Sequence, residues 1–175
     1  NNTYASLMRQ LQWNALDNVT VNLRSLNGEN VDSIMLDGTL TVQSHFGKIA
    51  VRRIITPSTD LPAVVEQITM TNGGQRAVKV TIDNSVRSII TDKDNDVNGS
   101  YVIDQVVQPV GIQLLAPGKS LNVYSVIYGR RNNEAQPSID VAKEISKRRA
   151  FVRQIQDQLV LDTSDPVINR MFAFA

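Results

Sequence analysis

The alternation of hydrophobic and polar residues along this chain changes its period once, near residue 137. Before that point the period is two, as where Val19, Val21 and Leu23 alternate with polar residues, and this period indicates strands with one buried face. The expected strands are 19–23, 33–43, 48–56, 63–71, 77–90, 101–107, 111–115 and 120–128. Turn sequences separate them, among them Asp37-Gly38, Asn72-Gly73-Gly74 and Pro117-Gly118. The pattern therefore predicts a mainly β fold, an antiparallel β-sandwich.

After Pro137 the apolar residues recur at the spacing of a helix. Ser138 is expected to cap its first turn, and Glu144 and Arg148 have the i, i+4 spacing of an ion pair. The stripe expected to pack against the sandwich consists of Val141, Ile145, Val152, Ile155 and Leu159. A helix over residues 139–159 would be about 30 Å long, roughly the width of a small domain.

A second helix is expected to begin at Asp165-Pro166. Asp165 can accept hydrogen bonds from the first free N–H groups, and Pro166 suits the first helical position. An apolar stripe follows, made of Val167, Ile168, Met171, Phe172 and Ala175. Because no stop signal follows this stripe, we expect the chain to be the front part of a longer protein. Further polypeptide or self-association would then cover the stripe.

Composition excludes several kinds of chemistry. The chain has no Cys and a single His, so disulfides, thiolate zinc sites and multi-histidine metal sites are ruled out. The chain has 18 Lys and Arg against 17 Asp and Glu, and this balance does not indicate a basic surface that binds nucleic acid. No apolar run has the length of a membrane span, and no cofactor is expected. The start Asn1-Asn2-Thr3 fits a processed or trimmed protein, so a periplasmic or extracellular location is expected and a cytoplasmic one stays open.

Oxygen ligands alternate in the segment 91–100 as Asp92, Asp94, Asp96 and Asn98. This alternation is typical of a calcium loop. The pattern departs from an EF-hand at Val97, where Gly is needed, and at Ile103, where a bidentate Glu is needed. A solvated hairpin loop is therefore favoured over a calcium site.

The remaining candidates for chemistry are few. Glu66, Asp83 and Asp104 lie in or near strands and are interpreted as outward-facing charges, so no catalytic residue is assigned. His45 precedes Phe46-Gly47 and is interpreted as a turn residue. Tyr124 shares a strand face with Tyr128, and packing is favoured over sugar stacking for both. The basic cluster Lys147-Arg148-Arg149 with Arg153 is expected to form a solvated or domain-contacting helix face.

Three segments, 65–82, 115–120 and 161–175, resemble bacterial glycoside hydrolases with a six-hairpin (α/α)6 barrel. The third segment resembles the beginning of the first barrel helix. The resemblance implies a galactose-mutarotase-like β-supersandwich over residues 1–136, a linker helix and connector over 137–164, and the start of the helical barrel over 165–175. In these families the acid and base carboxylates lie in the barrel, so the resemblance transfers no catalytic residue to this chain.

Two functions are open at this stage. In the first, the chain is a non-catalytic amino-terminal module of a glycoside hydrolase in carbohydrate degradation, with no activity of its own. Its partners would be the carboxy-terminal catalytic barrel of the same polypeptide and the carbohydrate substrate of the parent enzyme. In the second, the chain is a free-standing carbohydrate-binding or surface-assembly β-sandwich.

Overall fold

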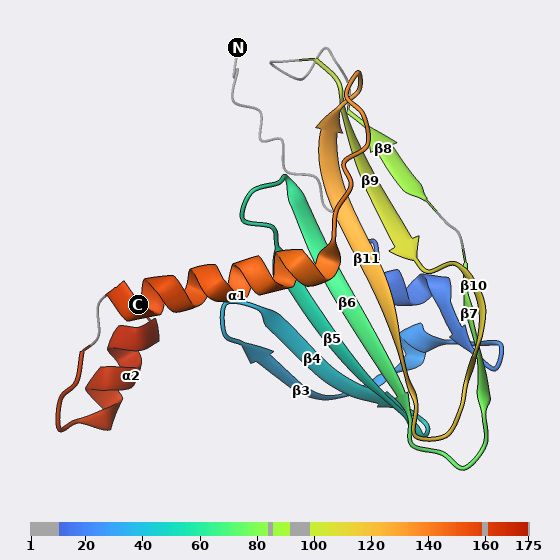
Figure 1. Cartoon of the computed structure of the whole chain (residues 1–175), viewed down its shortest axis with the longest axis horizontal. Helices are drawn as coiled ribbons and strands as arrows, with labels where there is room; N and C mark the ends of the chain where they lie inside the picture. The colour runs from blue at the N-terminus through green and yellow to red at the C-terminus, as the bar shows by residue number, and fades with distance from the viewer. Residues whose placement is uncertain (1–10, 84–85, 92–98, 159–160, 175) are drawn as a thin grey trace.

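A computed structural model describes residues 11–83, 86–91, 99–158 and 161–174. The fold is mainly β, with two antiparallel sheets packed as a sandwich and two α-helices after them (Figure 1). The fold class predicted from the sequence is confirmed.

The smaller sheet has the strand order β10-β7-β1-β2. Its strands are β10 (Gly111–Leu115), β7 (Val78–Ile82), β1 (Val19–Val21) and β2 (Arg24–Ser25). The larger sheet has the order β3-β4-β5-β6-β11-β9-β8. Its strands are β3 (Asn30–Leu36), β4 (Leu40–Phe46), β5 (Ile49–Pro57), β6 (Ala63–Asn72), β11 (Ser120–Arg131), β9 (Tyr101–Gln108) and β8 (Arg87–Ile90). Two short 3₁₀ helices, η1 (Ala15–Asn18) and η2 (Leu26–Gly28), flank β1 and β2.

Three of the expected strands differ in the structure. Residues 33–43 do not form one strand, because the chain reverses at Asp37-Gly38 between β3 and β4. Residues 77–90 form β7 and β8, which belong to different sheets. The strand expected over 19–23 ends at Val21, and Asn22 and Leu23 form a tight turn with φ of 49° and 67°. Leu23 is therefore exposed, although its spacing predicts burial.

The main core lies between the two sheets. Its fully buried members include Leu16, Val19, Leu26, Ile68, Met70, Val80, Ile82 and Val123. They come from η1, η2 and the inward faces of strands in both sheets, as the period of two requires. Burial of these side chains holds the smaller sheet over one end of the larger one.

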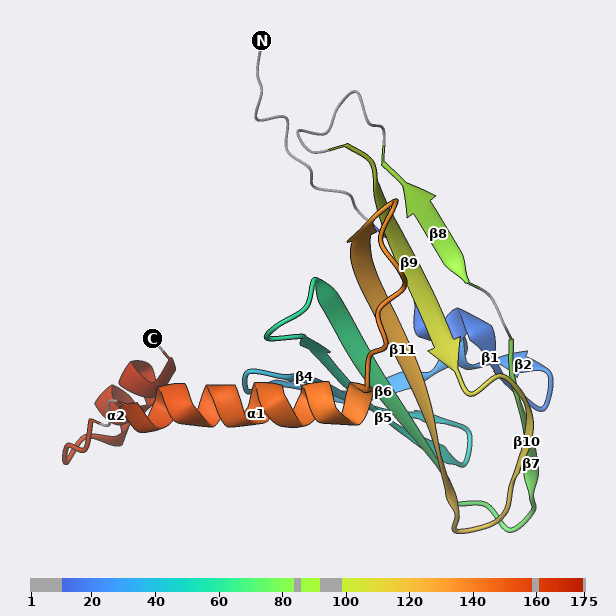
Figure 2. The same ribbon diagram turned by 45° about the horizontal axis from the view of Figure 1, so that its top comes forward.

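Helix α1 (Val141–Gln158) covers part of the outer face of the larger sheet, over β5, β6 and β11 (Figure 2). A second core cluster lies beneath it, made of Ile54, Val65, Val141 and Ile145 with Tyr124, Val126 and Ile139 against them. The helix is capped by Asp140, whose side chain accepts from the Lys143 N–H at 3.1 Å, and not by Ser138 as expected. The larger sheet thus has buried residues on both faces.

The second half of α1 extends past the sheet (Figure 1). Ile145 is 4% exposed and Ile155 is 52% exposed, so the expected packing of Ile155 against the sandwich is wrong. Leu159 lies outside the described residues. Val152 lies so close to Gly38, in the β3–β4 turn, that a Cβ at position 38 would collide with it. The positive φ of Gly38, 86°, also favours glycine there.

Helix α2 (Pro166–Phe174) begins as expected, with the Asp165 side chain accepting from the Val167 N–H at 2.8 Å. The Asn169 side chain accepts from the Thr163 N–H at 2.9 Å and fixes the connector before the helix. The apolar residues Val167, Ile168, Met171 and Phe172 are exposed, and Ala175 lies outside the described residues. Neither α1 nor α2 is long and apolar enough to cross a membrane, and the same holds for every helix of the described chain.

A matched pair of substitutions tests where α1 leaves the sheet. Ile145→Ala should lower the free energy of unfolding by about 2–5 kcal/mol, because it leaves a cavity in the cluster under the helix. Ile155→Ala should change it by less than about 0.5 kcal/mol, because the side chain is half exposed. Urea unfolding of both variants measures the difference. Equal losses would contradict the docking described here.

Candidate functional site

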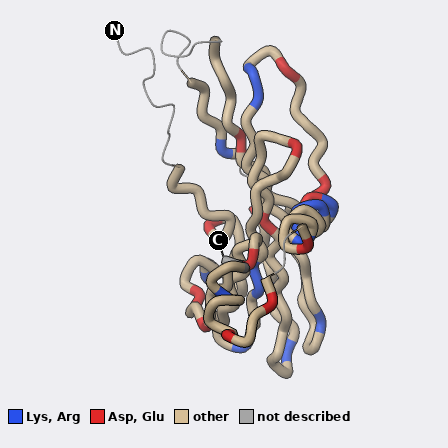
Figure 3. Tube along the Cα trace, turned by 90° about the vertical axis from the view of Figure 1, so that its left-hand side faces the viewer, with Lys and Arg blue, Asp and Glu red and all other residues tan. Residues whose placement is uncertain are grey.

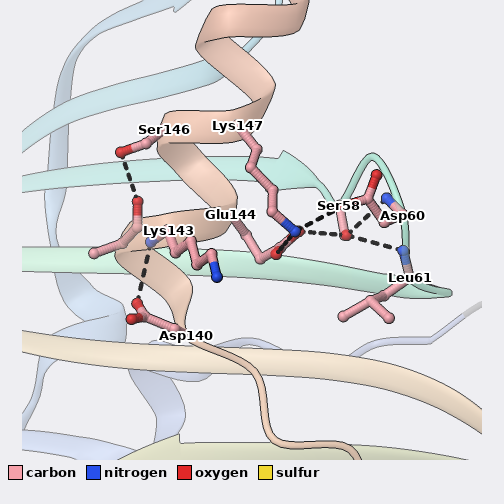
Figure 4. Close-up of polar contacts among 9 residues, drawn as sticks. Ser58, Asp60, Leu61, Asp140, Lys143, Glu144, Ser146 and Lys147 are labelled. Atoms are coloured by element: carbon pink, nitrogen blue, oxygen red, sulfur yellow. Dashed lines mark hydrogen bonds and ion pairs between the residues drawn. The ribbon is translucent and has the colours of Figure 1, made fainter.

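Four polar side chains hold the first turns of α1 to the loop between β5 and β6, and we call them the α1 anchor: Ser58, Asp60, Glu144 and Lys147 (Figure 4). Glu144 is buried and accepts hydrogen bonds from Ser58 Oγ and, at 2.9 Å, from Lys147 Nζ. Lys147 Nζ also contacts Asp60 Oδ2 at 2.7 Å. Ser58 Oγ in turn accepts from the backbone N–H groups of Asp60 and Leu61. The loop and the helix therefore share one connected network.

The anchor stays charged near neutral pH. The hydrogen bond from Ser58 lowers the pKa of Glu144 below its ordinary value, and Lys147 lowers it further, against the effect of burial. The hydrogen bonds to Asp60 and Glu144 raise the pKa of Lys147. The expected ion pair between Glu144 and Arg148 is wrong. Arg148 instead donates from Nε to the carbonyl oxygen of Gly38, in the β3–β4 turn, at 3.1 Å.

A pocket of about 590 Å³ opens between the start of α1 and the strands β9 and β11. We call it the helix-start pocket. Its aromatic residues are Tyr124, which is half-buried, and Tyr128, which is buried. Gln108, Gln136 and Asp140 add polar groups to the same lining. A pocket of this size, with aromatic walls and a few polar groups, is typical of small-ligand sites.

Two of the candidate carboxylates are buried, so their interpretation as outward-facing strand charges is wrong. Glu66 pairs with Arg53, whose Nε lies 2.6 Å from Oε1. Burial raises the pKa of Glu66, and the charge of Arg53 opposes that rise. Arg53 also contacts Glu29 Oε1 at 3.1 Å, and Glu29 accepts from the Ser44 hydroxyl. Sequence reasoning missed this cluster because its members come from β4, β5, β6 and the residue before β3, which are brought together by long-range strand pairing.

Asp104 is buried on the other face of the same sheet. It accepts a hydrogen bond from Ser88 Oγ at 2.6 Å and lies 3.4 Å from Arg130 Nε. Burial raises the pKa of the neighbouring Tyr128, and the Asp104 carboxylate adds to that rise. Asp83 follows β7 in the smaller sheet and is exposed, as the sequence predicts.

Strand register shows that Glu66 and Asp104 cannot act as a pair. Glu66 stands opposite Ser125 of β11. Asp104 stands opposite Tyr128 of the same strand. Because residues 125 and 128 are an odd number of positions apart, the two carboxylates point to opposite faces of the sheet. General acid and base groups of a glycosidase flank one bond, so this arrangement does not fit them.

His45 lies within β4 and not in the turn that follows it. Its Nδ1 is 2.8 Å from Asp32 Oδ1 on β3, and both side chains are about half exposed. The candidate calcium ligands Asp92, Asp94, Asp96 and Asn98 lie outside the described residues. Within the described ranges no three His, Asp or Glu side chains are grouped to hold a metal ion.

The α1 anchor was also missed by sequence reasoning, although two of its parts leave a signal. Glu144 and Lys147 have the i, i+3 spacing of a helical ion pair. Ser58 begins a turn in which its hydroxyl accepts from the backbone two and three residues later. The burial of Glu144 leaves no signal in the sequence, because that burial depends on where the helix lies on the sheet.

Comparison with known proteins leaves the family open. No protein-family model and no curated protein matches the chain. Among solved structures, a polysaccharide lyase is similar to this chain at 16% sequence identity with a TM-score of 0.35. The similarity covers 62% of this chain and 23% of the lyase, so the chain spans less than a quarter of that protein. A likeness this distant carries no argument about function.

The anchor predicts how stability depends on pH. Because the pKa of Glu144 is lowered by folding, its contribution is present above its ordinary pKa of 4.5 and is lost as the pH falls through the lower folded value. Glu144→Gln should therefore cost about 1–3 kcal/mol at pH 7 and less at pH 3. Urea unfolding at both pH values measures the cost. Asp157→Asn, an exposed change on the same helix, is the control and should cost little at either pH. A cost for Glu144→Gln that does not depend on pH would contradict the account.

Proposed function

We propose that this chain is a non-catalytic amino-terminal module of a carbohydrate-degrading glycoside hydrolase, which braces the catalytic (α/α)6 barrel of the same polypeptide. In this proposal residues 1–136 form the sandwich, 137–164 the linker, and 165–175 the start of the helical domain. The substrate of the barrel is a carbohydrate, and this chain contributes no reacting group.

The observation that carries the proposal is a set of exposed apolar residues at the end of the molecule where α1 leaves the sheet. We call this set the brace surface: Met35, Phe151, Ile155, Val167, Ile168, Met171 and Phe172. They belong to the second half of α1 and to α2, which lie at the left in Figure 1, and to β3, which lies below α1 nearer the centre. Large exposed apolar side chains gathered in one region are typical of an interface with another domain.

The position of α1, which carries Phe151 and Ile155 of the brace surface, is fixed by contacts with the sandwich. The α1 anchor and Ile145 hold the first turns of the helix, and the contact of Val152 with Gly38 holds its middle against the β3–β4 turn. A partner bound to the second half of α1 would therefore be held in a set orientation to the sandwich. Fixing the orientation of the catalytic domain in this way is the role that we propose for the module.

A helical partner suits α2 best. Its exposed residues Val167, Ile168 and Met171, with Phe172, form a stripe at the spacing by which helices pack on one another. The resemblance of residues 161–175 to the beginning of a first barrel helix also favours a helical partner. The separation of Glu66 and Asp104 on opposite sheet faces supports placing catalysis in the barrel.

The alternative is a free-standing carbohydrate-binding module. The helix-start pocket favours it, since Tyr124 offers an aromatic ring and Gln108, Gln136 and Asp140 offer partners for sugar hydroxyls. In this alternative the brace surface would be covered by a second copy of the chain or by another surface-assembly protein. Hydrogen exchange in α2 distinguishes the two functions.

The test compares amide hydrogen exchange in this chain and in the full polypeptide that its gene encodes. Amides of residues 167–172 should exchange at least about tenfold more slowly in the full polypeptide, because packing in a helical domain protects α2. Amides in the middle of β6 serve as the control and should exchange at the same rate in both.

Two results would contradict the proposal. One is equal exchange of residues 167–172 in the two samples. The other is a gene product without a helical domain after α2. Either result, together with binding of a neutral oligosaccharide by this chain, would favour the alternative.

A further inference from the structure

A second pocket, of about 830 Å³, lies where the loop between β6 and β7 meets the β4–β5 turn and the β1–β2 hairpin. We call it the basal pocket. It shares no lining residue with the helix-start pocket. The lowest hairpins of the molecule in Figure 3 carry blue, basic segments.

Three basic side chains line the basal pocket, those of Arg24, Lys48 and Arg76, and no Asp or Glu lines it. All three residues are exposed, and none forms an ion pair with a carboxylate in the described part of the chain. Glu29 is a sequence neighbour of the lining, but its carboxylate is occupied by Arg53 and Ser44. The pocket therefore gathers three uncompensated positive charges in a chain whose net charge is +1.

The loop between β6 and β7, which carries Arg76, is fixed by Asn72, which is fully buried. The Asn72 side chain accepts from the Gly74 N–H at 2.9 Å and donates to the Arg76 carbonyl oxygen at 2.8 Å. The Gly73 N–H donates to the Lys48 carbonyl oxygen at 2.9 Å. The backbones of Lys48, in the β4–β5 turn, and Arg76, in the β6–β7 loop, are thus tied together, which lowers the entropy cost of binding a shared ligand.

The third basic side chain, that of Arg24, contacts an aromatic ring. The guanidinium of Arg24 lies over the ring of Phe46, 5.6 Å from its centre. This contact covers one face of the ring, so a nucleotide base cannot stack on that face while Arg24 occupies it. Asn30 and Gln75, also in the lining, carry amide groups that suit hydroxyl groups.

We infer that the basal pocket binds an acidic oligosaccharide, whose carboxylate or sulfate groups pair with Arg24, Lys48 and Arg76 and whose hydroxyls meet Asn30 and Gln75. The choice of an anion rests on the three unpaired cations. The choice of a saccharide rests on the proposed function. Binding at this pocket needs no barrel, so it can be measured on the chain alone.

The experiment measures calorimetric binding of a galacturonate tetrasaccharide to this chain at low salt, with a neutral glucose tetrasaccharide and an oligonucleotide of equal charge in parallel. The uronate should bind more tightly than either, and its affinity should fall as salt is added. Lys48→Gln and Arg76→Gln should each weaken it by about tenfold, because each removes one charge-assisted contact.

The matched control is Arg52→Gln, which removes one exposed charge from β5 outside the pocket and should change the affinity by less than about twofold. Thermal unfolding of each variant confirms that it is folded. Equal binding of the neutral sugar, tighter binding of the oligonucleotide, or an equal effect of Arg52→Gln would overturn the inference. None of these results changes the exchange of α2 amides, so a failure here is distinct from a failure of the brace.

Discussion

The structure depends on the need of the larger sheet to bury both of its faces. Its central strand β6 carries Ile68 and Met70 on one face and Val65 on the other, all fully buried. The smaller sheet covers the first face, and α1 covers part of the second. The placement of α1 and the anchor around Glu144 follow from that constraint.

The same constraint explains why α1 is both fixed and extended. Its first two turns have apolar partners on the sheet, and the anchor supplies the charged contacts that a buried Glu needs. Beyond the β3–β4 turn the sheet ends, and the apolar residues of the helix face solvent. A helix of this kind can transmit a set orientation from one domain to another, whereas a flexible linker cannot.

Sequence reasoning identified the fold class because alternation and turn residues are local signals. It missed the turn at Asn22-Leu23, where two residues other than glycine adopt positive φ. It also could not predict that Ile145 is buried and Ile155 is exposed, because both fall on the same helical stripe. The width of the sheet beneath the helix decides which of them is covered, and long-range strand pairing sets that width. Glu66 was misjudged for a similar reason, since its partner Arg53 is supplied by the register between β5 and β6.

The fixed direction of α1 is the central claim, and the absence of Cys from the chain allows a direct measurement of it. Nitroxide labels at Ala50→Cys on β5 and Arg153→Cys on α1 occupy exposed positions on the sheet and on the extended half of the helix. Double electron–electron resonance should give one narrow distance distribution, which broadens when Glu144→Gln is added because the anchor is lost. A broad distribution without that substitution would show that α1 is not held, and would contradict the account.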